Sequence, residues 1–142
     1  MKFSDSEKKL SPKKIAKIEA DLGVNLPKIL VEYYLRYNGG VPNPYVFQQG
    51  SIDTSVSEFL SLTSIEGDTS PAVYKDLVLE KKIVPVQFYP FAIDGGGDYF
   101  FLDMNDPKET VYLYIHDTVR KKPFINLRMS FTEFWDYLKE DD

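Results

Sequence analysis

Apolar residues along the first forty positions recur at the spacing of two amphipathic helices. The first apolar stripe consists of Ile15, Ile18 and Leu22, and the second of Leu30, Tyr33, Tyr34 and Tyr37. A Ser-Pro pair precedes the first stripe and a Leu-Pro pair the second, while Gly23 and an Asn-Gly-Gly run follow them. Serine caps helices, proline suits their first turn, and glycine adopts the left-handed conformation that ends them. The pattern predicts helices over 11–23 and 26–40.

Between residues 41 and 82 the pattern changes. Alternating residues between prolines and polar turns predict two short strands, around 45–48 and 58–63. Another Ser-Pro pair follows, and the apolar residues behind it are Val73, Leu77 and Val78. Their spacing predicts a third helix over 70–82.

From residue 83 onward the chain is rich in β-branched and aromatic residues, which predicts a series of strands. These strands cover residues 83–94, 98–103, 110–116 and 124–129. Some of these runs are apolar at consecutive positions, so part of the sheet should be covered on both faces. The chain then closes with SFTEFWDYL, where Ser130 and Glu133 have capping-box spacing and aromatic residues follow at helical spacing. This ending predicts a last helix.

Most predicted strands follow one another directly instead of alternating with helices. This order favours an α+β fold with a mainly antiparallel mixed sheet flanked by helices. With 142 residues and 16.4 kDa, the chain has the size of one domain. It shows no repeat or linker, so we expect a single domain over 1–142 with its core at about 11–140.

Composition restricts the chemistry and the cellular location. The chain has no cysteine, which excludes disulfides, thiolate nucleophiles and cysteine metal sites. It has no apolar run that would serve as a signal peptide or a membrane span, so we expect a cytoplasmic protein that does not contact a membrane.

The net charge of −5 is unevenly distributed. Residues 1–40 carry eight Lys and Arg against five Asp and Glu, whereas residues 41–110 carry four against eleven. Such an acidic middle repels a phosphate backbone, so no direct binding of nucleic acid is expected. It would attract a basic protein, although a solvated surface without a partner has the same composition.

No set of residues with the spacing of a catalytic or metal site is found. His116 is the single histidine, and no G-x-S-x-G motif is present to accompany it. One histidine without cysteine also disfavours zinc. Residues 103–114 begin like a calcium loop, with Asp103 and Asn105, but Pro107, Lys108 and Tyr114 break the pattern. We therefore expect no catalytic residue, no metal and no cofactor.

The run DGGGD at residues 94–98 is the most unusual feature. It lacks the glycine spacing and the lysine of phosphate-binding loops, and its two carboxylates would repel phosphate. Glycine permits positive φ, and an Asp side chain accepts a hydrogen bond from the backbone two residues on, which favours a hairpin turn. A tip that contacts another protein and a cation site are the alternatives.

Three segments resemble the SUKH superfamily, whose name-giving member is a fungal cell-wall regulator of the Smi–Knr type. The segments are LGVNLPKILVEYYLRYNGGVP, IVPVQFYPFAIDGGGDYFFLD and the closing SFTEFWDYL, and together they span roughly residues 11–140. The positions that match the family pattern are Leu26, Pro27, Tyr37, Asn38, Gly39, Gly40, Pro42, Pro85, Phe91, Gly96, Gly97, Asp98 and Asp103. These matching residues are expected to be structural.

The resemblance implies an α+β fold and a binding function. Bacterial members of the family are mostly immunity proteins that bind and neutralise a polymorphic toxin, often a nuclease, without turnover. By resemblance, the expected partner is a cognate toxin domain, which the acidic middle suggests is basic. A regulatory or scaffold protein that binds a cellular partner is the alternative, and a small cation-dependent enzyme using Asp94, Asp98 and Asp103 is a third reading.

If binding is the function, exposed aromatic and acidic residues outside the apolar stripes are the candidates for contacting the partner. These candidates are Tyr45, Phe47, Glu66, Asp68 and Asp94. The structural alternatives are an ordinary edge strand for the two aromatic residues and solvated turns for the acids.

Overall fold

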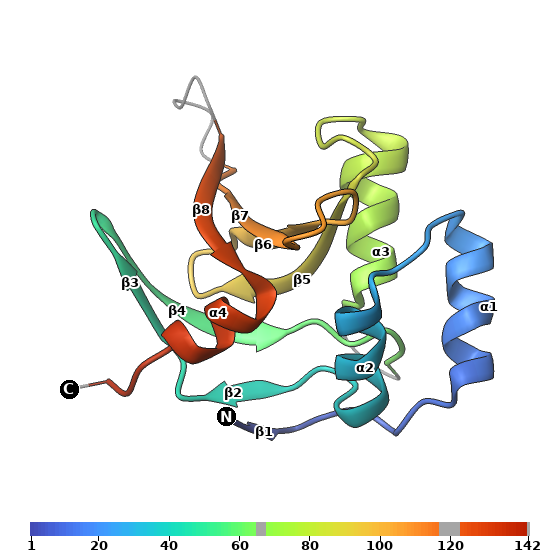
Figure 1. The fold of residues 1–142 in the computed structure, drawn as a ribbon, viewed down its shortest axis with the longest axis horizontal. Coiled ribbons are helices and arrows are strands. Elements are labelled where there is room, and N and C mark those ends of the chain that lie inside the picture. Colours follow the sequence, from blue (N-terminus) through green and yellow to red (C-terminus); the bar gives the residue numbers. More distant parts are fainter. Residues whose placement is uncertain (65–67, 117–122, 142) are drawn as a thin grey trace.

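The centre of the fold is a six-stranded antiparallel sheet, shown in Figure 1. The computed structural model describes residues 1–64, 68–116 and 123–141. Strands that follow one another in sequence are also neighbours in the sheet. They are β3 (Val46–Gln49), β4 (Ile52–Phe59), β5 (Phe88–Asp94), β6 (Tyr99–Asp103), β7 (Thr110–Tyr114) and β8 (Phe124–Ser130). The expected α+β class and the antiparallel sheet are confirmed.

The sheet curls until its two edges approach each other. β3 and β8 are the edge strands, yet the Gln49 side-chain amide donates to the Leu127 carbonyl at 2.8 Å. A register shift in β5 between Pro90 and Ala92 marks a β-bulge, a feature that strengthens local twist. The result is a strongly curved sheet whose inner face can enclose a core.

Four α-helices and one π-helix lie around the sheet in the described part of the chain. They are α1 (Pro12–Leu22), α2 (Lys28–Arg36), α3 (Ser70–Tyr74), the π-helix η1 (Lys75–Glu80) that continues α3, and α4 (Phe131–Tyr137). Ser11 caps α1 and Gly23 ends it with φ of 71°. The capping box of Ser130 and Glu133 is present at the start of α4. None of these helices is long and apolar enough to cross a membrane.

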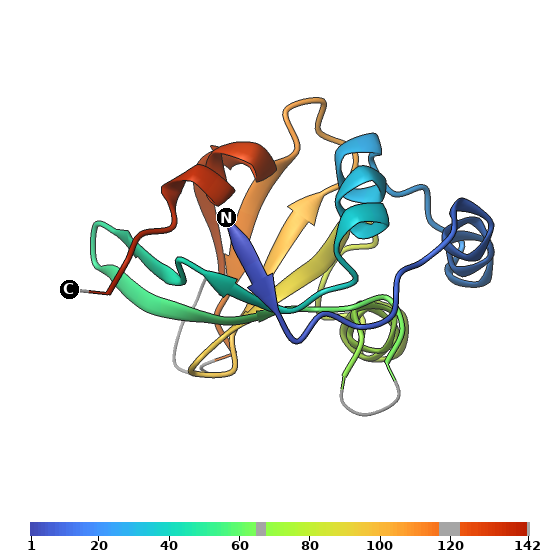
Figure 2. The same ribbon diagram turned by 90° about the horizontal axis from the view of Figure 1, so that it is seen from below.

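A second, two-stranded sheet joins the N-terminus to the segment after α2. It pairs β1 (Lys2–Ser4) antiparallel with β2 (Val41–Asn43). Gly40 is bridged to Phe59 by two backbone hydrogen bonds of 2.8 and 3.0 Å, so the small sheet is attached to the end of β4. This attachment places the N-terminal strand beside α2 and α4 (Figures 1 and 2).

The core is mostly aromatic and fills both faces of the central sheet. On the inner face Phe134 of α4 packs against Phe47, Phe91 and Phe100 at ring distances of 4.9 to 5.5 Å. On the other face Tyr74 of α3 stacks on Tyr89 of β5 at 5.5 Å. Figure 2 shows α4 and α3 on opposite sides of the sheet. Burial on both faces accounts for the consecutive apolar positions of β5 and β6.

Some predicted boundaries differ from the structure. The strand expected at 58–63 is wrong, because β4 ends at Phe59 and begins six residues earlier than expected. Helix α2 ends at Arg36, and Tyr37 and the Asn-Gly-Gly run that was expected to end it follow directly. The third helix changes to π geometry after Tyr74. β1 and β2 have no counterpart among the predicted elements, because three-residue strands carry too few positions to show a period.

Candidate binding site

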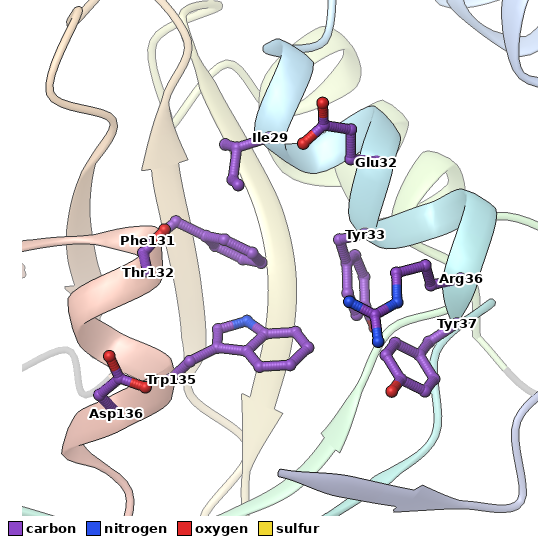
Figure 3. Close-up of a pocket in the computed structure, with 9 residues that line it drawn as sticks. All are labelled: Ile29, Glu32, Tyr33, Arg36, Tyr37, Phe131, Thr132, Trp135 and Asp136. Carbon is purple, nitrogen blue, oxygen red and sulfur yellow. The ribbon is translucent and has the colours of Figure 1, made fainter.

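A groove lies between α2 and α4, on the side of the molecule that carries the N-terminal strand. We call it the α2–α4 groove, and its volume is about 270 Å³. Figure 3 shows its nine lining residues, which come from both helices. They are Ile29, Glu32, Tyr33, Arg36, Tyr37, Phe131, Thr132, Trp135 and Asp136. Its walls are therefore mostly apolar and aromatic, with charged groups at the rim.

Helical spacing places these side chains on facing surfaces. On α2, Ile29, Tyr33 and Arg36 follow at intervals of four and three, which puts them on one face. On α4, Phe131 and Trp135 are four residues apart and face α2 (Figure 3). The rings of Tyr33 and Trp135 meet across the groove at 5.6 Å in an edge-to-face arrangement. Both walls are thus presented by short helices, of which α4 begins with a capping box.

Phe3 of β1 is packed beneath the aromatic walls. Its ring lies 4.8 Å from that of Tyr37, 5.4 Å from Trp135 and 5.1 Å from Phe59. Edge-to-face and tilted arrangements at these distances are the favoured geometries for aromatic pairs. Phe3 therefore fixes the spacing between the two walls.

Three polar groups of the groove have distinctive surroundings. The guanidinium of Arg36 lies over the ring of Tyr37, 5.4 Å from its centroid. The indole nitrogen of Trp135 is buried and has no hydrogen-bond partner among the described residues. Burial, and then the neighbouring Tyr34, raises the pKa of the Tyr33 hydroxyl well above its usual value, so it stays protonated. The groove therefore combines apolar surface with hydrogen-bond donors.

An acidic edge lies near the groove, where the N-terminal segment meets the end of β4. We use this name for Asp5, Glu7, Glu58 and Asp68, which line one shallow polar depression. Partial burial raises the pKa of the Glu58 carboxyl, and the charges of Asp68 and Glu7 raise it further. A positive group from a partner would relieve this repulsion.

The Asn-Gly-Gly run of the family pattern has a structural role. Asn38 is buried, donates to the Lys8 carbonyl and the Thr63 hydroxyl at 2.9 Å, and accepts from the Leu62 amide at 2.8 Å. Gly39 has φ of 72°, and a Cβ there would lie 2.7 Å from backbone atoms of Phe59. These residues join α2, the N-terminal segment and β4 so closely that side chains would not fit.

The other matching residues also lie at structural positions. Leu26 is buried, and Pro27 precedes α2 and accepts from the amides of Leu30 and Val31. Pro42 is buried in β2, whereas Pro85 is exposed before β5. Asp103 accepts from the Asn105 amide in the turn after β6. Tyr37 is the exception, because it ends α2 and also lines the groove.

The DGGGD run forms the hairpin turn between β5 and β6. One oxygen of Asp94 accepts from the amides of Gly96 and Asp98 at 2.9 and 2.8 Å, and the other accepts from the Thr54 hydroxyl. Gly97 has φ of 89°, which glycine adopts without strain. Asp98 pairs with the ring of His116 and accepts from its amide at 3.1 Å. The predicted turn is confirmed.

The described residues around the hairpin supply no companion ligands for a cation. Within the described residues no group of three or more His, Asp or Glu side chains is arranged to hold a metal ion. Both oxygens of Asp94 are already engaged by hydrogen bonds of the turn. The two carboxylates of this run thus have a structural role, because they accept hydrogen bonds from backbone amides of the turn and of His116.

Of the five residues predicted to contact a partner, the four that the structure describes do not form one surface. Phe47 is completely buried against Phe100 and Phe134, and Asp94 is almost completely buried, so the expectation that they lie on the surface is corrected. Tyr45 is half-buried and donates to Asp141 near the C-terminus. Asp68 is exposed on the acidic edge, and Glu66 lies outside the described residues.

Sequence reasoning did not find the α2–α4 groove. Tyr33, Tyr37, Phe131 and Trp135 were expected on buried helix faces, and all four are buried or partly buried, but the two helices are almost a hundred residues apart in the chain. The available signal was that both stripes are unusually aromatic, with Arg36 beside the first. Periodicity reports that a face is apolar but does not report which other face it meets.

An α+β domain with an aromatic groove and an acidic edge has the surface features of a binding protein. The chain belongs to the SMI1/KNR4 family (SUKH-1), whose sequence profile matches residues 9–140. Searches of curated proteins and of solved structures gave no match. The resemblance drawn from the three sequence segments is therefore confirmed at the level of the family.

Proposed function

We propose that this chain is an immunity-type protein that neutralises a cognate polymorphic toxin, a nuclease, by binding it directly and without catalysis. Membership of the SMI1/KNR4 family over residues 9–140 carries this proposal. The protein would act in the cytoplasm, where an incoming or newly made toxin meets its target. Neutralisation requires only that the complex cover the toxin's active surface.

The acidic edge supports a basic partner. Partial burial raises the pKa of Glu58 and the charges of Asp68 and Glu7 raise it further, so the edge carries mutual repulsion in the free chain. A nuclease has to attract phosphates and presents positive charge around its active site. Opposite charges steer the two proteins together and suppress wrong partners. The same acidic edge would discourage direct binding of nucleic acid by this chain.

The first experiment is co-expression with the toxin encoded immediately upstream of the gene. We expect growth to be restored and the two proteins to co-purify as a stable complex. Continued toxicity without complex formation would refute the immunity function. Capture of a cellular protein unrelated to a toxin would instead favour the regulatory or scaffold role.

A second experiment tests the acidic edge alone. The double charge reversal Glu58→Lys with Asp68→Lys should lower the affinity for an inactivated toxin at least about tenfold, mainly through slower association. Glu80→Lys is the matched control, because this exposed carboxylate lies on η1 outside the acidic edge. Equal effects of the edge and control variants would remove the acidic edge from the interface while leaving the immunity function intact.

A further inference from the structure

We propose that the α2–α4 groove is the anchor site for the partner protein, and that it receives a bulky apolar side chain from a segment that also carries Lys or Arg. This inference rests on the proposed function, since it names the part of the surface that holds the toxin. It also specifies the chemistry of the segment that binds there.

The size of the groove suits a side chain better than a small-molecule ligand. Its volume of about 270 Å³ lies below the roughly 300–1,000 Å³ of typical ligand pockets. It is open to the surface along the gap between the two helices (Figure 3). A groove of this size can surround one bulky apolar residue while the rest of the segment stays outside.

The walls consist of the residue types that dominate binding energy in protein interfaces. Trp, Tyr and Arg are enriched at such positions, and here Trp135, Tyr33, Tyr37 and Arg36 converge on one groove. Rigid aromatic rings lose little conformational entropy when a partner binds. The guanidinium of Arg36 is already stacked on the ring of Tyr37, and this contact holds Arg36 at the opening of the groove. The groove is thus preorganised as an anchor.

Charge at the rim selects the neighbours of the anchored residue. Glu32 projects from α2 and Asp136 from α4, on opposite sides of the groove (Figure 3). Glu32 is 3.9 Å from the exposed Lys28, and no ion pair of Asp136 is found in the described part of the chain. Glu109 also lies near Glu32, because burial and then the charges of Asp106 and Glu32 raise the pKa of its carboxyl. Three carboxylates around the groove therefore outnumber Lys28 and Arg36, which favours a basic segment over an acidic one.

The same charges argue against a second copy of this chain as the occupant. A twofold contact places the same patch on both sides of the interface. Each copy would then contribute the same acidic patch, in a chain whose net charge is −5. Like charges brought together across an interface oppose association. A basic partner meets no such repulsion.

Trp135 is both part of the wall and the single tryptophan of the chain. Its indole nitrogen is shielded from water and lacks an acceptor among the described residues. A small turn of the ring toward an incoming backbone carbonyl would give it one. The indole N–H therefore reports occupation of the groove in a spectrum where no other tryptophan contributes.

The test uses the full chain and the inactivated toxin domain encoded upstream. Thr132→Tyr places a bulky side chain at the groove edge, and Ala16→Tyr places the same side chain on the exposed face of α1 as a control. We expect Thr132→Tyr to weaken binding at least tenfold and Ala16→Tyr to leave it unchanged. The rim reversal Glu32→Lys with Asp136→Lys should also weaken binding, by five- to tenfold at low salt. Thermal unfolding of each variant checks that the fold is retained.

A direct readout comes from nitrogen-15 labelling of this chain alone. The single indole N–H signal should shift when unlabelled wild-type toxin is added, and it should not shift in Thr132→Tyr. If the wild-type chain binds the toxin while Thr132→Tyr retains its affinity and the indole signal stays fixed, the groove is not the anchor although immunity stands. If the wild-type chain does not bind the toxin, the proposed function and this inference both fail. Self-association that Thr132→Tyr abolishes would assign the groove to a second copy and overturn the proposal.

Discussion

Replacing Asn38 by Ala should cost more stability than any surface substitution. The Asn38 side chain makes hydrogen bonds at 2.9, 2.9 and 2.8 Å and a longer one at 3.5 Å, which join the end of α2 to the N-terminal segment and to the chain after β4. Each such bond contributes about 1 kcal/mol net, and a donor left buried without an acceptor costs about 1–3 kcal/mol. The Leu62 amide would become such a donor. We expect a total loss of about 3 kcal/mol, and, at roughly 3 °C per kcal/mol for a chain of this length, a melting temperature lower by about 10 °C.

The assay for this prediction is thermal and urea unfolding followed by circular dichroism. The matched control is Asn25→Ala, because Asn25 is exposed between α1 and α2 and should change stability by no more than about 0.5 kcal/mol. A stability loss below about 1 kcal/mol would refute the view that Asn38 is the polar link between these segments.

Three further predictions concern single positions. Gly39→Ala should destabilise the fold by more than Gly23→Ala. Both glycines have φ near 70°, but of the two only Gly39 has backbone atoms 2.7 Å from the position of an added Cβ. The free energies of unfolding of the two variants test this difference. Glu58→Gln should stabilise the chain at pH 7. The folded-state pKa of Glu58 is raised, so the stabilising contribution of Glu58 is present below its unfolded pKa and is lost as pH rises through the folded value. Urea unfolding should therefore show that Gln stabilises the chain at pH 7 and that this gain disappears below pH about 4. Asp94→Ala should lower the free energy of unfolding by about 2 kcal/mol, because it leaves the amides of the turn without their acceptor. Calorimetric titration of calcium into the wild-type chain should show no micromolar binding. Micromolar calcium binding that is lost on Asp98→Ala would contradict this account of the turn.

Features set by neighbouring residues were predicted well from the sequence. The cap at Ser11, the stop at Gly23 and the capping box of Ser130 and Glu133 all occur where the pattern indicated. The DGGGD turn was also predicted, because glycine conformations and Asp-to-backbone bonds act over two to four residues. Sequence patterns report such local preferences directly.

Features that depend on distant segments were not predicted. Phe47 was expected on the surface because it lies outside the apolar stripes, whereas its burial comes from Phe134, far away in the chain. The α2–α4 groove has the same kind of cause, since Tyr33 of α2 meets Trp135 of α4 only in the folded chain. In each case a tertiary contact decided between two local options that the sequence left open.

The family pattern and the proposed anchor site are physically connected, although most of the pattern lies outside the groove. Asn38 and Gly39 attach the end of α2 to the chain at the end of β4. This attachment sets the position of the Tyr33 and Tyr37 rings relative to Trp135. Phe3 reaches the same rings only because β1 pairs with β2 directly after the two glycines. A scaffold fixed in this way holds the groove at one spacing, so substitutions at its rim can change the partner without changing the fold. Such an arrangement suits a protein whose function is to match one particular partner, because specificity then resides in a few exposed side chains carried on a rigid frame.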